Sequence, residues 1–313
     1  MQIGIIGTGM VGSSIAFSIA TEGLADKLIL IDTNTARATA EAMDISHAAP
    51  FSFGTIITSG EYTDLKNADI IIITAGANQK PGETRLDLLS KNVSIFKQII
   101  PEIIKYAPKA ILLIATNPVD IMTEITLKLS DFPKNRVIGT GTVLDSARFR
   151  SILGHHLGIS PKSIHANVIG EHGDSEVLLW AGAVAGTSSI ERIAKQLNIS
   201  LDTNIKNKID NEVRSAAYTI IEGKGSTYYG IAAATQYIVK AISSDNHTIL
   251  NISSHHDTYL DEPADTCFST PSIISKQGVE KTLIPVMDNK EQKALMDSVS
   301  TLTTYTKKAI ELL

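Results

Sequence analysis

The chain has very little cysteine: Cys267 is the one cysteine among 313 residues. This count excludes a disulfide framework and a cysteine-based zinc site, and it fits a reducing compartment. No apolar run approaches the roughly 20 residues that a membrane helix needs. The first basic residue is Lys27, so the positively charged start of a signal peptide is missing. We therefore expect a soluble, cytoplasmic protein with no membrane association and no metal site.

Basic clusters are missing as well. The net charge is −5, from 28 lysines and arginines against 33 aspartates and glutamates. Because binding to a phosphate backbone needs a basic patch, we expect no nucleic-acid partner. Hydrophobic residues make up 43% of the chain, which is enough to bury a sizeable core and argues against disorder. The length is typical of about two domains.

The first part of the chain alternates apolar runs with amphipathic stretches. Residues 3–6, 28–31, 70–73 and 111–114 are nearly all apolar, as in strands that are buried on both faces of a parallel sheet. Helices are predicted over residues 11–21, 35–47, 85–106 and 119–129. This rhythm predicts βαβ units and an α/β fold with a Rossmann-type, doubly wound parallel sheet over residues 1–142.

The second part, residues 143–313, has a mixed pattern that predicts an α+β domain. Helices are expected over residues 145–157, 204–222, 230–242 and 289–312, and a strand over residues 165–169. Residues 247–275 look strand-like but irregular, and we interpret the segment from His255 to Glu262 as a surface loop. The adjacent pairs His155–His156 and His255–His256 are interpreted as solvated or structural, because neighbouring helical residues point about 100° apart.

A glycine motif lies between the first predicted strand and the first predicted helix. Residues 7–12 read GTGMVG. In this G-x-G-x-x-G pattern Gly7 permits a tight turn, Gly9 lets the backbone approach a pyrophosphate, and Gly12 lets the helix pack closely on the sheet. A plain glycine turn is the alternative.

Asp32 ends the next apolar run, twenty residues after the last glycine of the motif. A carboxylate there would accept hydrogen bonds from the adenosine ribose and repel a 2′-phosphate, so NAD is favoured over NADP. The nearby Arg37, which we also expect among the cofactor-binding residues, weakens this preference. The alternative for Asp32 is a helix cap.

Further polar residues lie where a ligand cleft forms in this fold class, at strand ends and in loops. These are Gln79 and Arg85 after the run at 70–73, Asn117 after the run at 111–114, and His172 between two glycines. Asp145 and Arg148 are three residues apart on a predicted helix, so they share a face.

Four blocks around these residues resemble the NAD-dependent L-lactate/malate dehydrogenase family. They are ANQKPGETR at 77–85, ATNPVD at 115–120, GTVLDSARFR at 141–150 and GEHGDS at 170–175. The resemblance spans nearly the whole chain and is greatest to the bacterial L-lactate branch. It implies an enzyme that uses NAD, acts on pyruvate and L-lactate in the second domain, and assembles as a homo-oligomer, typically a tetramer.

The resemblance also implies residue roles. His172 would be the acid/base, held and stabilised by Asp145. Arg148 would grip the substrate carboxylate with two hydrogen bonds, and Arg85 would polarise the carbonyl when a loop closes. Asn117 would orient the carbonyl and border the nicotinamide. Each residue also has an ordinary interpretation when it is taken alone. His172 would be a surface or core histidine, Arg148 and Arg85 would be surface arginines, and Asn117 would be a helix cap.

Gln79 decides between the branches of the family. Malate dehydrogenases carry arginine there, to pair with a second carboxylate, whereas a neutral glutamine leaves room for the methyl group of pyruvate. The alternative is an exposed loop glutamine. Thr227 matches a position that lines the substrate pocket. Cofactor contacts are implied for Val11, Tyr62, Gly76 and Ala77, although Tyr62 also fits generic packing.

Two more positions resemble the fructose 1,6-bisphosphate site at a subunit interface of bacterial lactate dehydrogenases. Arg150 lies about 200° around the helix from Arg148, facing away from the substrate, and the second position is His165. A bisphosphate would relieve repulsion between these cations near a two-fold axis. The alternative is that nearby carboxylates neutralise both.

For the function of the whole chain two alternatives remain. The first is a malate or broader 2-hydroxy-acid dehydrogenase, and the second is a non-catalytic NAD-binding relative.

Overall fold

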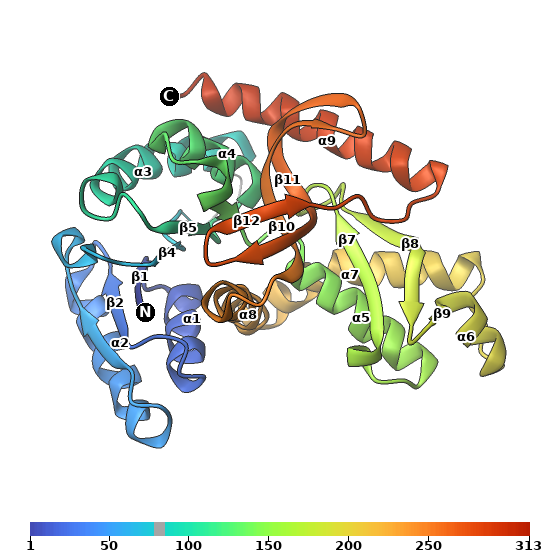
Figure 1. The fold of residues 1–313 in the computed structure, drawn as a ribbon, viewed down its shortest axis with the longest axis horizontal. Helices are drawn as coiled ribbons and strands as arrows, with labels where there is room; N and C mark the ends of the chain where they lie inside the picture. The colour runs from blue at the N-terminus through green and yellow to red at the C-terminus, as the bar shows by residue number, and fades with distance from the viewer. Residues whose placement is uncertain (78–84) are drawn as a thin grey trace.

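A computed structural model describes residues 1–77 and 85–313 of the chain (Figure 1). Within these residues nine strands form one sheet, in the order β12-β11-β10-β6-β5-β4-β1-β2-β3. The six strands from β6 to β3 in this order pair in parallel. Their bounds are β1 Gln2–Ile6, β2 Lys27–Ile31, β3 Ile56–Ser59, β4 Ile70–Ile73, β5 Ile111–Ile114 and β6 Val137–Gly139. The predicted Rossmann-type parallel sheet is confirmed.

Helices cover both faces of the parallel strands. Alternate strand residues enter two separate cores, one with α3 and α4 and the other with α1 and α2. This explains why strands such as IIII at β4 and ILLI at β5 are buried at every residue. The helices are α1 Met10–Thr21, α2 Thr35–Ala48, α3 Arg85–Tyr106 and α4 Val119–Ser130.

The sheet continues into the second half of the chain. The strands β10 Thr248–Tyr259, β11 Glu262–Ser275 and β12 Gly278–Thr282 form an antiparallel ribbon, and β10 pairs with β6 through Ser253 and Gly139. The prediction of a surface loop from His255 to Glu262 is wrong for most of this segment, because residues 255–259 belong to β10 and Glu262 begins β11. Leu260 and Asp261 alone form the turn between the two strands. The side chain of His255 is 2% exposed.

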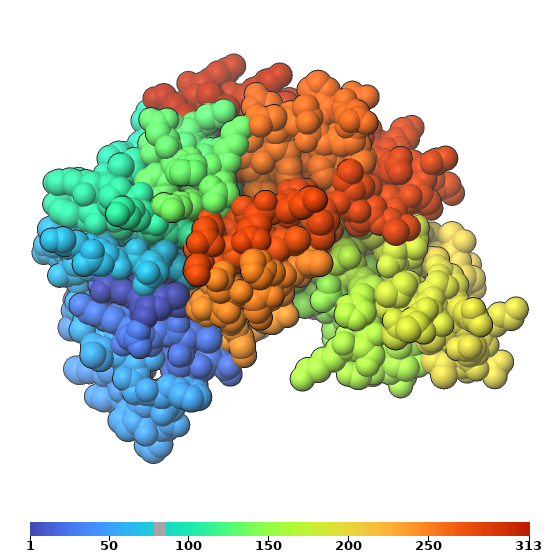
Figure 2. Space-filling view, in the orientation of Figure 1, coloured from blue at the N-terminus to red at the C-terminus, as the bar shows by residue number. Residues whose placement is uncertain are grey.

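The remaining elements form a second lobe, which Figure 2 shows projecting in yellow and green away from the blue N-terminal lobe. A three-stranded antiparallel sheet, again counted within the described ranges, carries the helices of this lobe on a core of its own. The elements are α5 Val143–Leu157, β7 Ile164–Ile169, β8 Val177–Ala185, β9 Ser188–Ser189, α6 Ile190–Gln196 and α7 Thr203–Lys224. The helices α8 Tyr229–Ser244 and α9 Asn289–Ile310 pack back on the large sheet, on its two opposite faces. Among the described helices, none is long and apolar enough to cross a membrane.

Candidate active site

A histidine, an aspartate and an arginine meet where the two lobes join. His172 lies in the loop after β7, and Asp145 lies in the first turn of α5. The Nδ1 atom of His172 is 2.7 Å from Oδ2 of Asp145, and Nη1 of Arg148 donates a 2.7 Å hydrogen bond to Oδ1 of the same carboxylate. The Asp145 side chain is 2% exposed. One buried carboxylate therefore orients both cations and leaves Nε2 of His172 on the opposite side of the ring.

This arrangement stabilises the protonated imidazole. Burial disfavours the charged form, but the carboxylate of Asp145 outweighs it and raises the pKa of His172 to about 9. Burial equally disfavours the Asp145 carboxylate, yet His172 and Arg148 hold the pKa of that carboxyl below its usual value. The protonated imidazole is therefore the favoured form of His172 at neutral pH.

Two further buried carboxyl groups act on His172, and the sequence had assigned no role to either. The backbone N–H of His172 donates a 2.7 Å hydrogen bond to Oδ2 of Asp120, and burial raises the pKa of Asp120 to about 6. Burial, with the charge of Asp145, raises the pKa of Glu176 to about 8. Ligand atoms of Glu176, Asp145 and His172 all lie within 4.8 Å of one another. Asp120 lies in the ATNPVD block, and this position could have marked it as a site residue. No feature of the sequence marks Glu176.

His172 lines a cavity of about 240 Å³. Its wall includes Asn117 and Pro118 from the loop after β5 and apolar side chains of α3 and α4. The backbone carbonyl of Asn117 accepts a hydrogen bond from Nδ2 of Asn92, a buried residue that the sequence reasoning missed. The cavity is thus apolar along much of its wall, with an imidazole at one side.

A second cavity, of about 710 Å³, lies over the glycine motif. Its lining contains the predicted residues Gly7, Gly9, Val11, Gly12, Asp32, Arg37, Tyr62 and Gly76. A Cβ on Gly12 would stand 1.9 Å from the carbonyl oxygen of Gly7, whereas a Cβ on Gly9 would meet no atom within 4 Å. Gly12 therefore permits the close turn, and Gly9 leaves an open approach to the backbone.

Asp32 faces this groove from the end of β2. Its Oδ2 accepts hydrogen bonds from the N–H (2.7 Å) and hydroxyl (3.1 Å) of Thr8. Burial opposes the charge, but these bonds hold the pKa of Asp32 below its usual value. The cap of α2 is Asn34, which accepts from the N–H of Arg37, and the Arg37 side chain lies 3.7 Å from Glu41.

The other predicted site residues are placed less centrally. Ala77 donates its N–H to Oδ1 of Asn92 and does not line the groove. Thr227 is half-buried between α7 and α8, next to Ser226 of the groove lining. Gln79 lies outside the described residues, and so does the side chain of Arg85, the first residue of α3.

The two predicted effector residues lie on neighbouring elements. Arg150 of α5 donates from Nε to the carbonyl of Ala166 at 2.8 Å and from Nη2 to Oδ1 of Asn167 at 3.2 Å. His165 is exposed on β7. Arg150 is therefore held by neutral oxygens of β7. The alternative interpretation of this position expected nearby carboxylates to neutralise it.

Comparison with known proteins agrees with this geometry. Residues 1–139 match the family profile described as lactate/malate dehydrogenase, NAD binding domain, and residues 142–313 match the profile of its alpha/beta C-terminal domain. This chain belongs to the lactate/malate dehydrogenase family. NAD is accordingly the cofactor of the first domain, in agreement with the groove over the glycine motif.

Relatives within the family cover the chain almost completely. It is 47% identical to an L-lactate dehydrogenase of Allorhizobium ampelinum, over 96% of this chain and 97% of that one. Identity to an L-lactate dehydrogenase of Thermus aquaticus is 44%, again over 96% and 97%. The crystal structure of a minor L-lactate dehydrogenase from Enterococcus mundtii in its ligands-bound form superposes with a TM-score of 0.94 at 37% identity, over 98% of each chain.

Proposed function

We propose that this protein is an NAD-dependent L-lactate dehydrogenase that interconverts pyruvate and L-lactate. The observation that carries the proposal is the pairing of His172 Nδ1 with Asp145 Oδ2 at 2.7 Å, in a histidine that lines a small cavity. The names of the relatives at 47% and 44% identity support the same reaction. NAD, when bound, supplies the hydride chemistry.

His172 moves the proton of the reaction. In the direction of pyruvate reduction, its Nε2–H gives a proton to the C2 oxygen as C2 gains a hydride, and a hydroxyl forms. In the reverse direction, neutral His172 takes the hydroxyl proton of lactate. Asp145 fixes the tautomer and stabilises the imidazolium, so the proton leaves and returns at one atom.

Cationic and amide groups bind and orient the substrate. Nη1 of Arg148 is committed to Asp145, so Nε and Nη2 are the donors assigned to the substrate carboxylate. We assign polarisation of the carbonyl to Arg85 and orientation of the substrate to Asn117. Thr227 is assigned to the pocket wall.

A substrate panel with NADH tests this function. We expect kcat/KM for pyruvate to exceed that for oxaloacetate, and Gln79→Arg to shift the ratio toward oxaloacetate by about 100-fold or more, because a buried carboxylate then gains a partner. The exposed variant Lys66→Gln is the control. Absence of NADH oxidation with pyruvate, or an unchanged ratio in Gln79→Arg, contradicts the proposal.

We further propose that the protein is a cytoplasmic homotetramer and that fructose 1,6-bisphosphate regulates it. The exposed ring of His165 and the β7-bound guanidinium of Arg150 would take the phosphates across a subunit interface. We expect the bisphosphate to lower the KM for pyruvate in the wild-type protein and to have no effect in His165→Gln. Identical saturation curves with and without it, across pH, would reject this site.

A further inference from the structure

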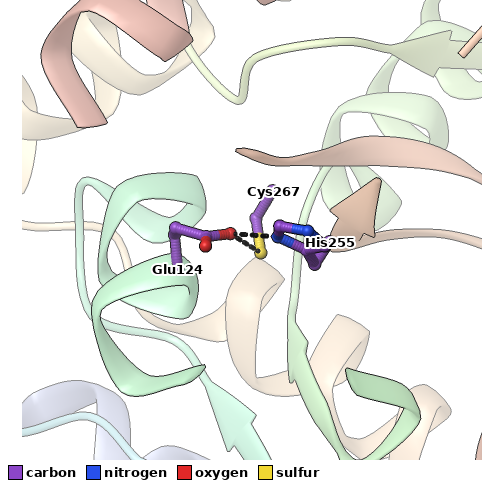
Figure 3. A group of neighbouring side chains, drawn as sticks. All are labelled: Glu124, His255 and Cys267. Carbon is purple, nitrogen blue, oxygen red and sulfur yellow. Dashed lines mark hydrogen bonds and ion pairs between the residues drawn. The ribbon is translucent and has the colours of Figure 1, made fainter. Parts of the chain in front are cut away.

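Three side chains of metal-ligand type meet in the interior, and none of them lines either cavity described above. They come from three elements: Glu124 of α4, His255 of β10 and Cys267 of β11 (Figure 3). Oε2 of Glu124 is 2.7 Å from Nδ1 of His255 and 3.1 Å from Sγ of Cys267. Glu124 and Cys267 are fully buried. We propose that this cluster is a binding site for Zn²⁺.

The donor atoms suit zinc in kind and spacing. A thiolate, an imidazole nitrogen and a carboxylate oxygen are its usual protein ligands, at about 2.0–2.3 Å from the metal. The three atoms here all lie within 4.8 Å of one another, so small side-chain movements bring them around one ion. The second oxygen of Glu124, Oε1, is buried and accepts no hydrogen bond from the described residues, and its one ion-pair partner among them is Lys128, at 3.3 Å. It becomes a further ligand if that lysine turns away.

Zn²⁺ would replace protons that now point at a single oxygen. Figure 3 shows the sulfur of Cys267 and the ring of His255 both directed at Oε2 of Glu124. Metal ligands must be deprotonated, so binding displaces the thiol proton and frees Nδ1 of the ring. Burial, and then the charge of Glu124, keeps the pKa of Cys267 well above its usual value, so the thiol is neutral until a metal binds.

The outer side of His255 has the partner that a zinc-bound histidine usually has. Its Nε2 lies 3.2 Å from Oδ1 of Asp257 and 3.8 Å from Oδ1 of Asp265. A carboxylate on this nitrogen holds the proton at Nε2 and turns the lone pair of Nδ1 inward. Asp257 is itself fixed by Lys134, at 2.6 Å.

The charges around the cluster permit a divalent cation. Zn²⁺ would balance the two negative charges of a Cys267 thiolate and the Glu124 carboxylate. Lys128 lies 3.3 Å from Oε1 of Glu124, but its side chain is 40% exposed and is able to turn into solvent. The two aspartates next to His255 are about three-quarters exposed, and they mark the route by which an ion would enter.

This site departs from the sequence-based expectation of no metal. That expectation counted cysteines, whereas the cluster combines one cysteine with a histidine of the same ribbon and a helical glutamate. The competing interpretation is a metal-free buried ion pair between Glu124 and His255.

Titration of the reduced, chelator-treated full chain with Co²⁺ and then Zn²⁺ distinguishes a zinc site from a metal-free ion pair. We expect one Co²⁺ per chain, with a sulfur-to-metal charge-transfer band in the near ultraviolet that Zn²⁺ abolishes. Zn²⁺ binding should release at least one proton per ion into a weakly buffered solution. A metal-free ion pair gives no such band, and its absence from fully reduced protein overturns the proposal.

Variants assign the ligands. Cys267→Ser, which is close to isosteric, should lose the charge-transfer band and weaken Zn²⁺ binding by about 100-fold or more, and Asp257→Asn should weaken it by about 10-fold. His247→Gln alters an exposed histidine that pairs with Glu280, and it should bind Zn²⁺ like the wild-type protein. Circular dichroism of each metal-free variant checks folding. A Cys267→Ser variant that folds and binds Co²⁺ with unchanged spectrum and affinity also overturns the proposal.

Discussion

The Nδ2 atom of Asn92 donates a 2.8 Å hydrogen bond to the backbone carbonyl of Asn117. The oxygen of the same amide accepts a hydrogen bond from the N–H of Ala77, also at 2.8 Å. One buried side chain thus joins the loop after β4 to the loop after β5. These two loops border the dinucleotide groove and the small cavity, so Asn92 sets their relative position.

Loss of the donor at Asn92 should impair substrate positioning. Asn92→Asp keeps the shape and the acceptor for Ala77 but leaves the carbonyl of Asn117 without its partner, which costs about 1–3 kcal/mol. We expect kcat/KM for pyruvate to fall by about 10- to 100-fold, measured by steady-state NADH oxidation. Ser94→Ala, exposed on the same helix, is the control and should be unchanged. Wild-type kinetics in Asn92→Asp would show that the amide has no positioning role.

The pH profile should report the pairing of His172 with Asp145. In the proposed mechanism pyruvate reduction uses the protonated ring, so kcat/KM should be level at neutral pH and fall as pH rises through about 9, the raised pKa of His172. In Asp145→Asn the carboxylate is gone and burial dominates, so the fall should occur at least about two pH units lower. Lactate oxidation needs the neutral ring, so kcat/KM for lactate should instead rise as pH rises through the same range.

Asp145→Asn should also lower the rate at pH 7 by about 100-fold or more, since the imidazolium loses its stabilising charge. Asp44→Asn, an exposed carboxylate on α2, is the matched control. A profile for Asp145→Asn that overlays the wild-type curve would remove Asp145 from the mechanism.

Glu176 should modulate the same titration without being essential. Its pKa, raised to about 8, leaves it neutral at pH 7, which Gln imitates, so Glu176→Gln should change the rate there by less than about threefold. Above pH 8 the wild-type carboxylate supports the charge of His172, so the alkaline limb of Glu176→Gln should shift to lower pH. Measurement of kcat/KM from pH 6 to 10 distinguishes this from an inert residue, whose replacement shifts no limb.

Glu176 should also affect stability, with a sign that follows from its raised pKa. The folded state holds this proton more tightly than the unfolded chain, so the stabilising contribution is complete below the unfolded pKa of about 4.5 and disappears as pH rises through about 8. Glu176→Gln should therefore flatten the fall in melting temperature over this window. Glu191→Gln, a more exposed carboxylate, should leave that fall in place.

Two glycines of the motif should fail in different ways. Gly12→Ala places a methyl group 1.9 Å from the carbonyl oxygen of Gly7, so the melting temperature should drop by several degrees. Gly9→Ala meets no protein atom within 4 Å, so stability should hold while NADH binding weakens by about 10-fold. Thermal unfolding and NADH fluorescence titration measure the two effects. Undiminished NADH affinity in Gly9→Ala would mean that the pyrophosphate lies elsewhere.

Local patterns predicted much of the first half of the fold. Strands such as Ile70–Ile73 and helices such as Arg85–Tyr106 have their predicted bounds, because full burial and amphipathic periodicity are properties of a continuous segment. The strands β3 and β6 are four and three residues long and gave too little pattern to detect. The pairing of Ser253 with Gly139 could not be predicted either, because periodicity does not say which distant strands become neighbours.

Spacing alone related site residues only where they share an element, whereas the pairing of His172 with Asp145 was expected from the family resemblance. Asp145 and Arg148 are three apart on one helix, and the structure brings their side chains to 2.7 Å. Asn92 and Glu176 have no such signal, because their partners lie on other elements and become neighbours on folding. His255 was misread because its burial depends on α4, which approaches β10 from far away in the sequence.

The union of β6 with β10 has a consequence for synthesis of the chain. A ribosome that has released residues 1–142 has delivered the cofactor-binding motif but not the strand that covers β6. Until residues 248–259 emerge, the short strand β6 is an edge of the nascent sheet, and the unpaired backbone groups of an edge strand are a template for pairing with other chains. Chaperone capture is therefore expected to be strongest during translation of the second lobe, and to end when β10 docks.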